Sequence, residues 1–140
     1  DRDGCEFTLT PIGEPDELEK AAEKGIVYLM VYAPPKDEAN VTKEDLDSQG
    51  EWATSAHIED AAHDFMVKGA EINIMHKGRP TADKVVENVV VQEDGWKVGK
   101  KSLRKGTWYI GVKLTKASRE AFKKGELTGA SMEGLKSLVA

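Results

Sequence analysis

Ser131 is the residue whose type and setting best suit chemistry, because it lies in the glycine-flanked stretch GELTGASMEG over residues 125–134. A serine hydroxyl attacks a carbonyl when a base within hydrogen-bond reach takes its proton. The candidate base is His76, far upstream in the chain. This pair predicts acyl-transfer chemistry if the fold brings the two side chains together. The alternative is an ordinary half-buried serine that hydrogen-bonds to the backbone.

The residues just before Ser131 indicate a strand. Leu127, Gly129 and Ser131 alternate along the chain, so they would share one face. A glycine two positions before the serine leaves open space beside it, which a substrate main chain would need. The alternative is that Gly129 marks a bulge or a tight crossing of strands.

His76 ends a second predicted strand, over residues 70–76, on which Ile72, Ile74 and His76 share a face. A histidine at the end of an apolar face can act as a base near neutral pH. It can equally be a satisfied core or edge residue. The pattern leaves both roles open.

Glu87 is a carboxylate in a third predicted strand, over residues 84–92, where it shares a face with the valines at 85, 89 and 91. Burying a carboxylate is unfavourable unless a charge or a hydrogen-bond donor is paired with it. We therefore expect Glu87 to have a partner. The alternative is that the face of Asn88 is the inner one and that Glu87 lies in water.

The most regular helical pattern follows Thr54 or Ser55 as the N-cap and ends at Gly69. Five apolar residues form one stripe at helical spacing: Ile58, Ala61, Ala62, Phe65 and Met66. His57 and His63 are six positions apart, which separates them by well over a right angle around a helix. This spacing predicts a solvated helix face rather than a zinc site, and no motif predicts a cofactor.

The remaining patterns position these candidates within a mixed fold. We predict further strands over residues 6–9, 26–31 and 107–114, helices over 15–24 and 115–124, a long loop over 36–51 and a basic loop over 93–106. No regular alternation of strand and helix appears. The fold class predicted is α+β, with a mostly antiparallel sheet or a partly closed barrel flanked by helices.

Length and composition restrict the function classes. The 140 residues predict one domain, of which 39% are hydrophobic and 32% charged. A net charge of -5 argues against nucleic acid as the main partner. The lysines and arginine between residues 97 and 105 form a basic cluster that could contact an acidic partner or nucleic acid, although a solvated hairpin tip is the favoured interpretation. The single cysteine, Cys5, forms no internal disulfide, and the apolar runs are too short to span a membrane. The chain opens with Asp1 and shows no secretory signal, so we expect a trimmed or processed piece of a longer polypeptide.

Four upstream stretches carry a resemblance to a known family. Residues 47–51, DSQGE, followed by AAHDF at 61–65, resemble a D-x-x-G-D turn and an AAHxF-like helix. The strand ending in IMH at 74–76 resembles the one that bears a catalytic histidine. The segment VVEN at 85–88 resembles a VVES segment.

Two downstream stretches complete it, namely KGTW at 105–108 and KGELTGAS at 124–131. They resemble a G-x-W strand and a KGE-x-x-G-x-S strand bearing a nucleophile. In order and spacing, residues 26–134 resemble the phage prohead (head maturation) proteases, specifically the XkdF-type phage serine proteases. We take residues 1–25 as an N-terminal extension of this core within a single domain. The GxSxG elbow of α/β-hydrolases is not present.

The resemblance implies a fold related to the herpesvirus assembly proteases, with Ser131 as nucleophile and His76 as general base and acid. It implies phage scaffold and capsid proteins as substrates, inside the assembling prohead in the cytoplasm of the bacterial host. It implies neither a cofactor nor a membrane, and it leaves a homodimer open. The oxyanion donors would be backbone N–H groups.

The chain departs from the resembled pattern in ways that leave two functions open. In related proteases the third member of the triad lies well after the serine in the sequence. In this sequence the only acidic residue after Ser131 is Glu133. We therefore advance Glu87 as the orienting acid. Glu51 replaces an aspartate, and Ala130 and Met132 stand where the family is richer in phenylalanine. The alternative function is a non-catalytic phage assembly or scaffold-binding module on the same fold.

Overall fold

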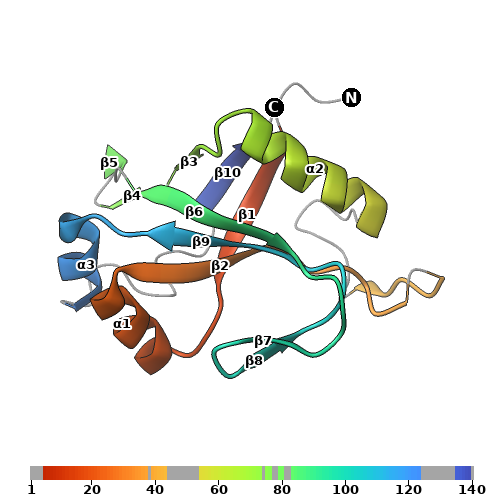
Figure 1. Cartoon of the computed structure of the whole chain (residues 1–140), viewed down its shortest axis with the longest axis horizontal. Helices are drawn as coiled ribbons and strands as arrows, with labels where there is room; N and C mark the ends of the chain where they lie inside the picture. The colour runs from red at the N-terminus through yellow and green to blue at the C-terminus, as the bar shows by residue number, and fades with distance from the viewer. Residues whose placement is uncertain are drawn as a thin grey trace.

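The computed structural model describes residues 5–37, 39–43, 54–73, 75–76, 79–80, 83–123 and 135–139 (Figure 1). Its main feature is a six-stranded antiparallel sheet in the order β3-β10-β1-β2-β9-β6. The strands are β1 (Cys5–Pro11), β2 (Ile26–Tyr32), β3 (Ile72–Asn73), β6 (Lys84–Val90), β9 (Trp108–Lys113) and β10 (Leu135–Val139). The prediction of a mixed fold on a mostly antiparallel sheet is therefore confirmed.

Strand β1 connects two parts of this sheet, because it changes partners along its length. Residues 5–9 pair with β10, whereas Thr10 and Pro11 pair with β2. In Figure 1, β1 and β10 cross β2 and β9 steeply, so the sheet bends at this strand. Within the described residues no pairing joins the two edge strands, β3 and β6. A closed barrel is therefore not found, and the described structure is a bent, open sheet.

Helix α2 (Ser55–Val67) covers one face of the sheet, because an apolar stripe along it must be buried. The Thr54 side chain accepts a hydrogen bond from the His57 N–H and caps its first turn, as predicted. Ile58, Ala62 and Phe65 are buried, and the Phe65 ring packs edge-on against Trp108 of β9. The predicted stripe is wrong at its end: Met66 is 47% exposed.

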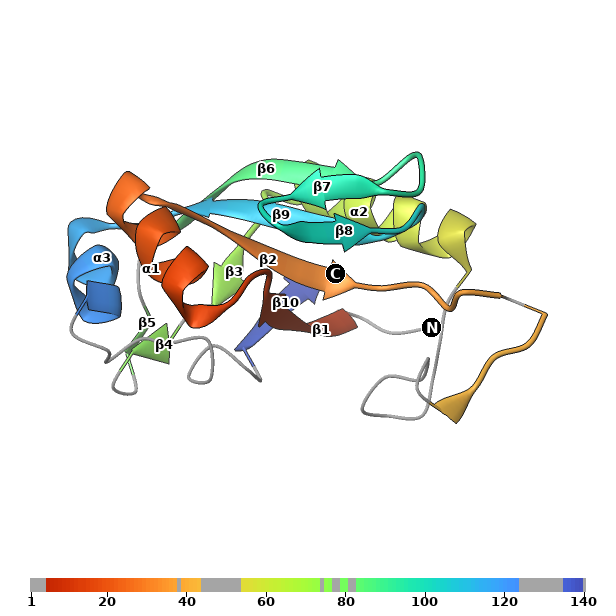
Figure 2. The ribbon, with the colours of Figure 1, turned by 90° about the horizontal axis from the view of Figure 1, so that it is seen from below.

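A hairpin covers the opposite face of the central strands. Its strands are β7 (Trp96–Val98) and β8 (Lys101–Leu103), within the segment predicted to be a basic loop. Figures 1 and 2 show the hairpin and α2 on opposite sides of β2, β9 and β6. Val91, Leu103 and Tyr109 form a second, smaller core beneath it. The hairpin therefore closes a separate apolar layer.

Two short helices pack together at one end of the sheet: α1 (Pro15–Lys24) and α3 (Lys116–Lys123). The start of α3 is held by Asp83, which precedes β6 and is only 6% exposed. Its two carboxylate oxygens accept hydrogen bonds from the Thr115 N–H at 2.7 Å and from the Ser118 hydroxyl at 2.9 Å. These bonds supply the partners that a buried carboxylate requires.

The strand predicted over residues 70–76 is divided in the structure. Ile72–Asn73 forms β3 of the large sheet, whereas β4 (Met75–His76) pairs with β5 (Arg79–Pro80) in a separate two-stranded sheet. Two different sets of hydrogen-bond partners therefore replace the single continuous strand expected from alternation. Ile74 lies outside the described residues.

The described helices are short. The longest of them, α2, has 13 residues, and none of those described combines the length and hydrophobicity that crossing a bilayer requires.

Candidate functional site

Ser131 lies outside the described residues, as does the whole of its glycine-flanked stretch. The strand that follows it is described: β10 begins at Leu135, four positions after the serine. The described element closest in sequence after the candidate nucleophile is therefore β10.

His76 follows closely in sequence after β3, the strand that pairs with β10. Its backbone belongs to β4, three positions after Asn73 of β3. Strand β3 pairs with β10 in antiparallel register, with Asn73 opposite Lys136 and Ile72 opposite Ser137. The strand before the candidate base and the strand after the candidate nucleophile are thus hydrogen-bonded neighbours.

Glu87 lies on β6 and is exposed. Its Oε2 accepts a hydrogen bond of 2.9 Å from the Tyr28 hydroxyl of β2, so it has the partner that the sequence led us to expect. This hydrogen bond is the main cause that raises the pKa of Tyr28, with burial second, because both disfavour the phenolate. The carboxylate therefore favours the protonated phenol over the phenolate.

Gly111 makes this contact possible. It lies on β9, between Tyr28 on β2 and Glu87 on β6, and it pairs with both. A Cβ at position 111 would come within 3.0 Å of Tyr28 Cε1 and 3.1 Å of Glu87 Oε2. A side chain there would occupy the space through which the phenol reaches the carboxylate.

The face of β6 differs from the prediction because the strand carries a bulge. The register shifts between Val85 and Glu87, which breaks the alternation expected from residue 85 onward. Val85 packs against the main core, whereas Val89 packs in the smaller core under the hairpin. The predicted shared face is therefore wrong at Val85.

Asn88 faces α2, as in the alternative that the sequence left open. Its side-chain N–H donates to the Ala62 carbonyl at 3.0 Å, and its oxygen accepts from Trp108 Nε1 at 2.7 Å. A polar side chain thus connects the helix to the strongest core strand. Glu87 lies on the other face, near the hairpin.

The three residues named by the sequence are related differently to the large sheet. The strands adjoining Ser131 and His76 meet along one edge of the large sheet. Glu87 lies on β6, which forms the opposite edge. The chain from His76 to the start of β6 at Lys84 is only eight residues long, so β6 follows His76 closely in sequence. Whether Glu87 orients His76 stays a prediction.

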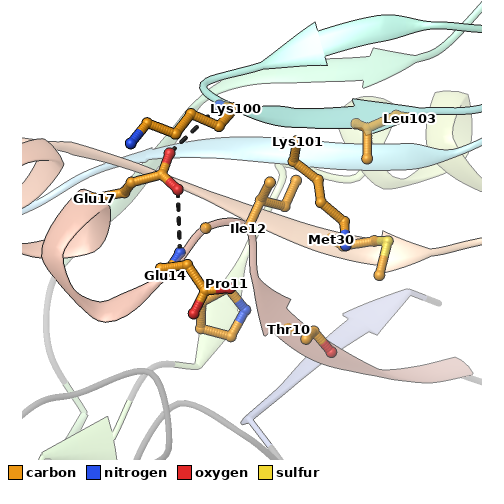
Figure 3. Close-up of a pocket in the computed structure, with 10 residues that line it drawn as sticks. Thr10, Pro11, Ile12, Glu14, Glu17, Met30, Lys100, Lys101 and Leu103 are labelled. Atoms are coloured by element: carbon orange, nitrogen blue, oxygen red, sulfur yellow. Dashed lines mark hydrogen bonds between the residues drawn. The ribbon is translucent and has the colours of Figure 1, made fainter.

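The sequence did not predict two adjacent hollows near the hairpin. One, of about 350 Å³, lies where β1, β2 and the hairpin meet (Figure 3). The other, of about 460 Å³, lies between α1, β2 and the hairpin and is bordered by Tyr28. The sequence feature that borders them is the basic segment 93–106. Its polar composition does not show that the segment folds back over the sheet as a hairpin.

The basic residues of that segment have different surroundings. Arg104 donates from Nε and Nη2 to the Pro34 carbonyl. The backbone N–H of Lys105 donates to Asp94. Lys100 and Lys101 line the smaller hollow instead.

The histidines of α2 provide no basis for a metal centre. His57 and His63 are both exposed on the helix surface. In the part of the chain that the structure describes, no three His, Cys, Asp or Glu side chains gather closely enough to hold an ion.

Comparisons with known proteins give two relatives from Bacillus subtilis (strain 168). The chain is 32% identical over 138 residues to "Phage-like element PBSX protein XkdF", covering 92% of this chain and 46% of that protein. It is 33% identical over 115 residues to "Uncharacterized protein YqbD", covering 82% of this chain and 33% of that protein. The chain thus spans less than half the length of these relatives. No solved structure matches it significantly, so the likeness to herpesvirus assembly proteases stays an expectation.

The sequence profile of one family spans almost the whole chain. Residues 16–139 match the family described as "Putative phage serine protease XkdF". This range contains β10, β3, β4 and β6 and the stretch around Ser131. The chain therefore belongs to this XkdF family, as the resemblance in its sequence indicated.

Proposed function

We propose that this chain is a serine endopeptidase domain in which Ser131 is the nucleophile and His76 the general base. The observation that supports this most directly is the antiparallel pairing of β10 with β3. Because the strands run in opposite directions, the residues before β10 and those after β3 leave the pair at the same end. Ser131 and His76 both belong to those segments.

Chain length limits how far apart the two residues can be. Extended chain advances at most about 3.3–3.6 Å per residue, so four residues before Leu135 reach roughly 14 Å and three after Asn73 roughly 11 Å. Both reaches begin from neighbouring strands. A hydrogen bond between the serine and the histidine is therefore within reach of the chain.

The proposed mechanism is acyl transfer in two steps. The Ser131 hydroxyl attacks the scissile carbonyl while His76 takes its proton, and His76 then gives that proton to the leaving amine. Water, activated by the same imidazole, hydrolyses the acyl-enzyme. Glu87 is proposed to orient His76 and to stabilise the imidazolium, and backbone N–H groups would bind the oxyanion.

Membership of a phage family supports a substrate class. We propose that the substrates are scaffold and capsid precursors, cleaved inside the prohead in the host cytoplasm. A relative whose name includes "Phage-like element" is consistent with this setting. Because the relatives are longer than this chain, the activity of the complete protein is part of the proposal.

A fluorophosphonate probe tests the nucleophile directly. We expect the probe to label the wild-type chain, to fail on Ser131→Ala, and to label His76→Ala much more slowly. Ser102→Ala, which changes an exposed serine of the hairpin, is the matched control and should label as the wild type does. Equal labelling of wild type and Ser131→Ala would overturn the assignment.

The second candidate function is a non-catalytic assembly or scaffold-binding module on the same fold. The observation that favours it is the engagement of Glu87 with Tyr28, which gives the carboxylate a structural role of its own. This candidate predicts no labelling of Ser131 together with retained binding of scaffold protein.

A further inference from the structure

The two hollows near the hairpin share a wall. Ile12 and Glu17 border both of them, so the hollows lie side by side along the line between α1 and the hairpin. We call the pair the α1–hairpin groove. Its lining comes from the end of β1 and the turn after it, from α1, from β2 and from the hairpin.

Lysines border the α1–hairpin groove on both sides. Lys20 and Lys24 project from α1 into the lining of the larger hollow, and their spacing of four residues puts them on one face of the helix. Lys100 and Lys101 border the smaller hollow from the hairpin (Figure 3). All four are exposed.

The acidic residues of the groove do not balance these lysines. Glu17 directs both oxygens at backbone N–H groups, Oε1 at Glu14 and Oε2 at Lys100, each at 3.4 Å. It therefore connects the start of α1 to the turn of the hairpin. Four lysines against two glutamates make this region positive, although the whole chain carries a net charge of -5.

The floor of the groove is apolar. Ile12 lies between the two hollows, with Tyr28 and Val98 in the larger one and Met30 and Leu103 in the smaller one. Ile12, Tyr28 and Val98 pack on the small core beneath the hairpin. A ligand for this groove needs apolar groups for the floor and negative charges for the rims.

We propose that the α1–hairpin groove binds an extended, acidic and apolar segment of a polypeptide. Two hollows divided by Ile12 suit side chains along an extended chain better than one compact ligand. Lysine pairs on both sides suit carboxylates spaced along that chain. The inference rests on the proposed function in one respect only, since that function makes the peptide part of a substrate.

Binding is measured without any cleavage, by fluorescence polarisation of a fluorescein-labelled peptide in which glutamate and leucine recur between serines. One comparison peptide has glutamine in place of each glutamate, and another has serine in place of each leucine. We expect the parent peptide to bind, both comparison peptides to bind at least about tenfold more weakly, and binding to weaken as salt is raised. Equal binding of all three peptides would overturn the proposal.

Lysine variants locate the binding. We expect Lys20→Gln/Lys24→Gln and Lys101→Gln each to weaken binding about three- to tenfold, because an exposed ion pair contributes modestly. The matched control is Lys36→Gln/Lys116→Gln, two exposed lysines that do not line the groove, which should bind as the wild type does. A control that loses as much affinity as the groove variants would overturn the proposal.

Two further outcomes separate the possible causes. Unlabelled oligothymidylate is added as a competitor at the same concentration of negative charges as an unlabelled parent peptide. Equal displacement by the two would show a surface that binds any polyanion, which overturns the proposal. Fluorophosphonate labelling of Ser131 in a chain that binds no peptide would leave the protease proposal standing and overturn this one. Peptide binding without labelling would support the groove and count against the protease.

Discussion

The Tyr28 hydroxyl donates a 2.9 Å hydrogen bond to Glu87 Oε2 from two strands away, across Gly111 of β9. The phenol ring also packs edge-on against Tyr109, with ring centroids 5.9 Å apart. This contact joins β2, β9 and β6 on the face beneath the hairpin. A residue that we selected as a candidate catalytic acid is therefore also part of the fold.

Gly111→Ala should destabilise the protein by about 1–3 kcal/mol, because the added Cβ would lie 3.0–3.1 Å from atoms of Tyr28 and Glu87, closer than ordinary van der Waals contact, and these side chains must give way. Urea unfolding monitored by circular dichroism measures the change. Tyr28→Phe serves as the comparison, since it removes the hydrogen bond and adds no volume. A Gly111→Ala protein as stable as the wild type would contradict the close packing described here.

The pKa of Tyr28 should fall when Glu87 is replaced by glutamine. The hydrogen bond to Glu87 is the largest cause of the raised pKa, and the negative charge adds to it. Ultraviolet absorbance of tyrosinate during an alkaline titration, with Tyr28→Phe to identify the signal, checks this.

The same shift predicts how stability depends on alkaline pH. The pKa of Tyr28 is higher in the folded than in the unfolded state. The stability that this contact contributes is therefore fully present below the unfolded pKa of about 10 and is lost as the pH rises through the folded pKa. The alkaline loss of stability should be smaller in Glu87→Gln. An identical loss in both proteins would contradict the linkage.

Much of the fold could be predicted because the local sequence patterns, such as helix caps and apolar periodicity, favour the same elements that the packed structure contains. Helix α1 has the predicted bounds, and Thr54 caps α2 as its side-chain chemistry requires. The main failures were non-local. The bulge in β6 depends on pairing with β9, and the division of 70–76 depends on two different partner strands. Neither partner can be identified from the alternation within one segment.

The site was less predictable for a related reason. Ser131 and His76 could be nominated from residue type, but their relation depends on β10 pairing with β3, more than sixty residues earlier in the chain. Tyr28 was not nominated at all. It lies in the strand predicted over residues 26–31, and its contact with Glu87 depends on the glycine between them. The groove depends on the hairpin folding back over the sheet.

Asp83→Ala should destabilise the protein by about 2–3 kcal/mol, because the half-buried Thr115 N–H and the buried Ser118 hydroxyl both lose a charged acceptor. Asp94→Ala is the matched control. Its carboxylate also accepts a backbone N–H, from Lys105, but in an exposed position where water can replace it. We expect the control to cost less than about 1 kcal/mol in a thermal melt. Equal losses would show that Asp83 has no special role in holding α3.

Asn88→Leu should destabilise the protein by about 1–3 kcal/mol, since it leaves the Trp108 Nε1 donor and the Ala62 carbonyl without this partner. Trp108 is fully buried, so tryptophan fluorescence and chemical denaturation report on the change. Gln92→Leu is a control, because the Gln92 amide bonds to the Val90 carbonyl in an exposed position. A larger loss in Gln92→Leu would contradict the connecting role of Asn88.

Two roles for Glu87 can be separated by comparing Glu87→Gln with Tyr28→Phe. If the carboxylate orients His76, Glu87→Gln should slow fluorophosphonate labelling of Ser131 by about 10²–10⁴-fold and change its pH dependence, whereas Tyr28→Phe should not. If Glu87 acts only through Tyr28, Tyr28→Phe removes the hydrogen bond, Glu87→Gln keeps a neutral oxygen that still accepts it, and labelling should change little in either variant. Urea unfolding of both variants accounts for any common loss of stability. A slow Glu87→Gln beside a normal Tyr28→Phe would assign the acid to the proposed triad, because no shared structural effect could produce that difference.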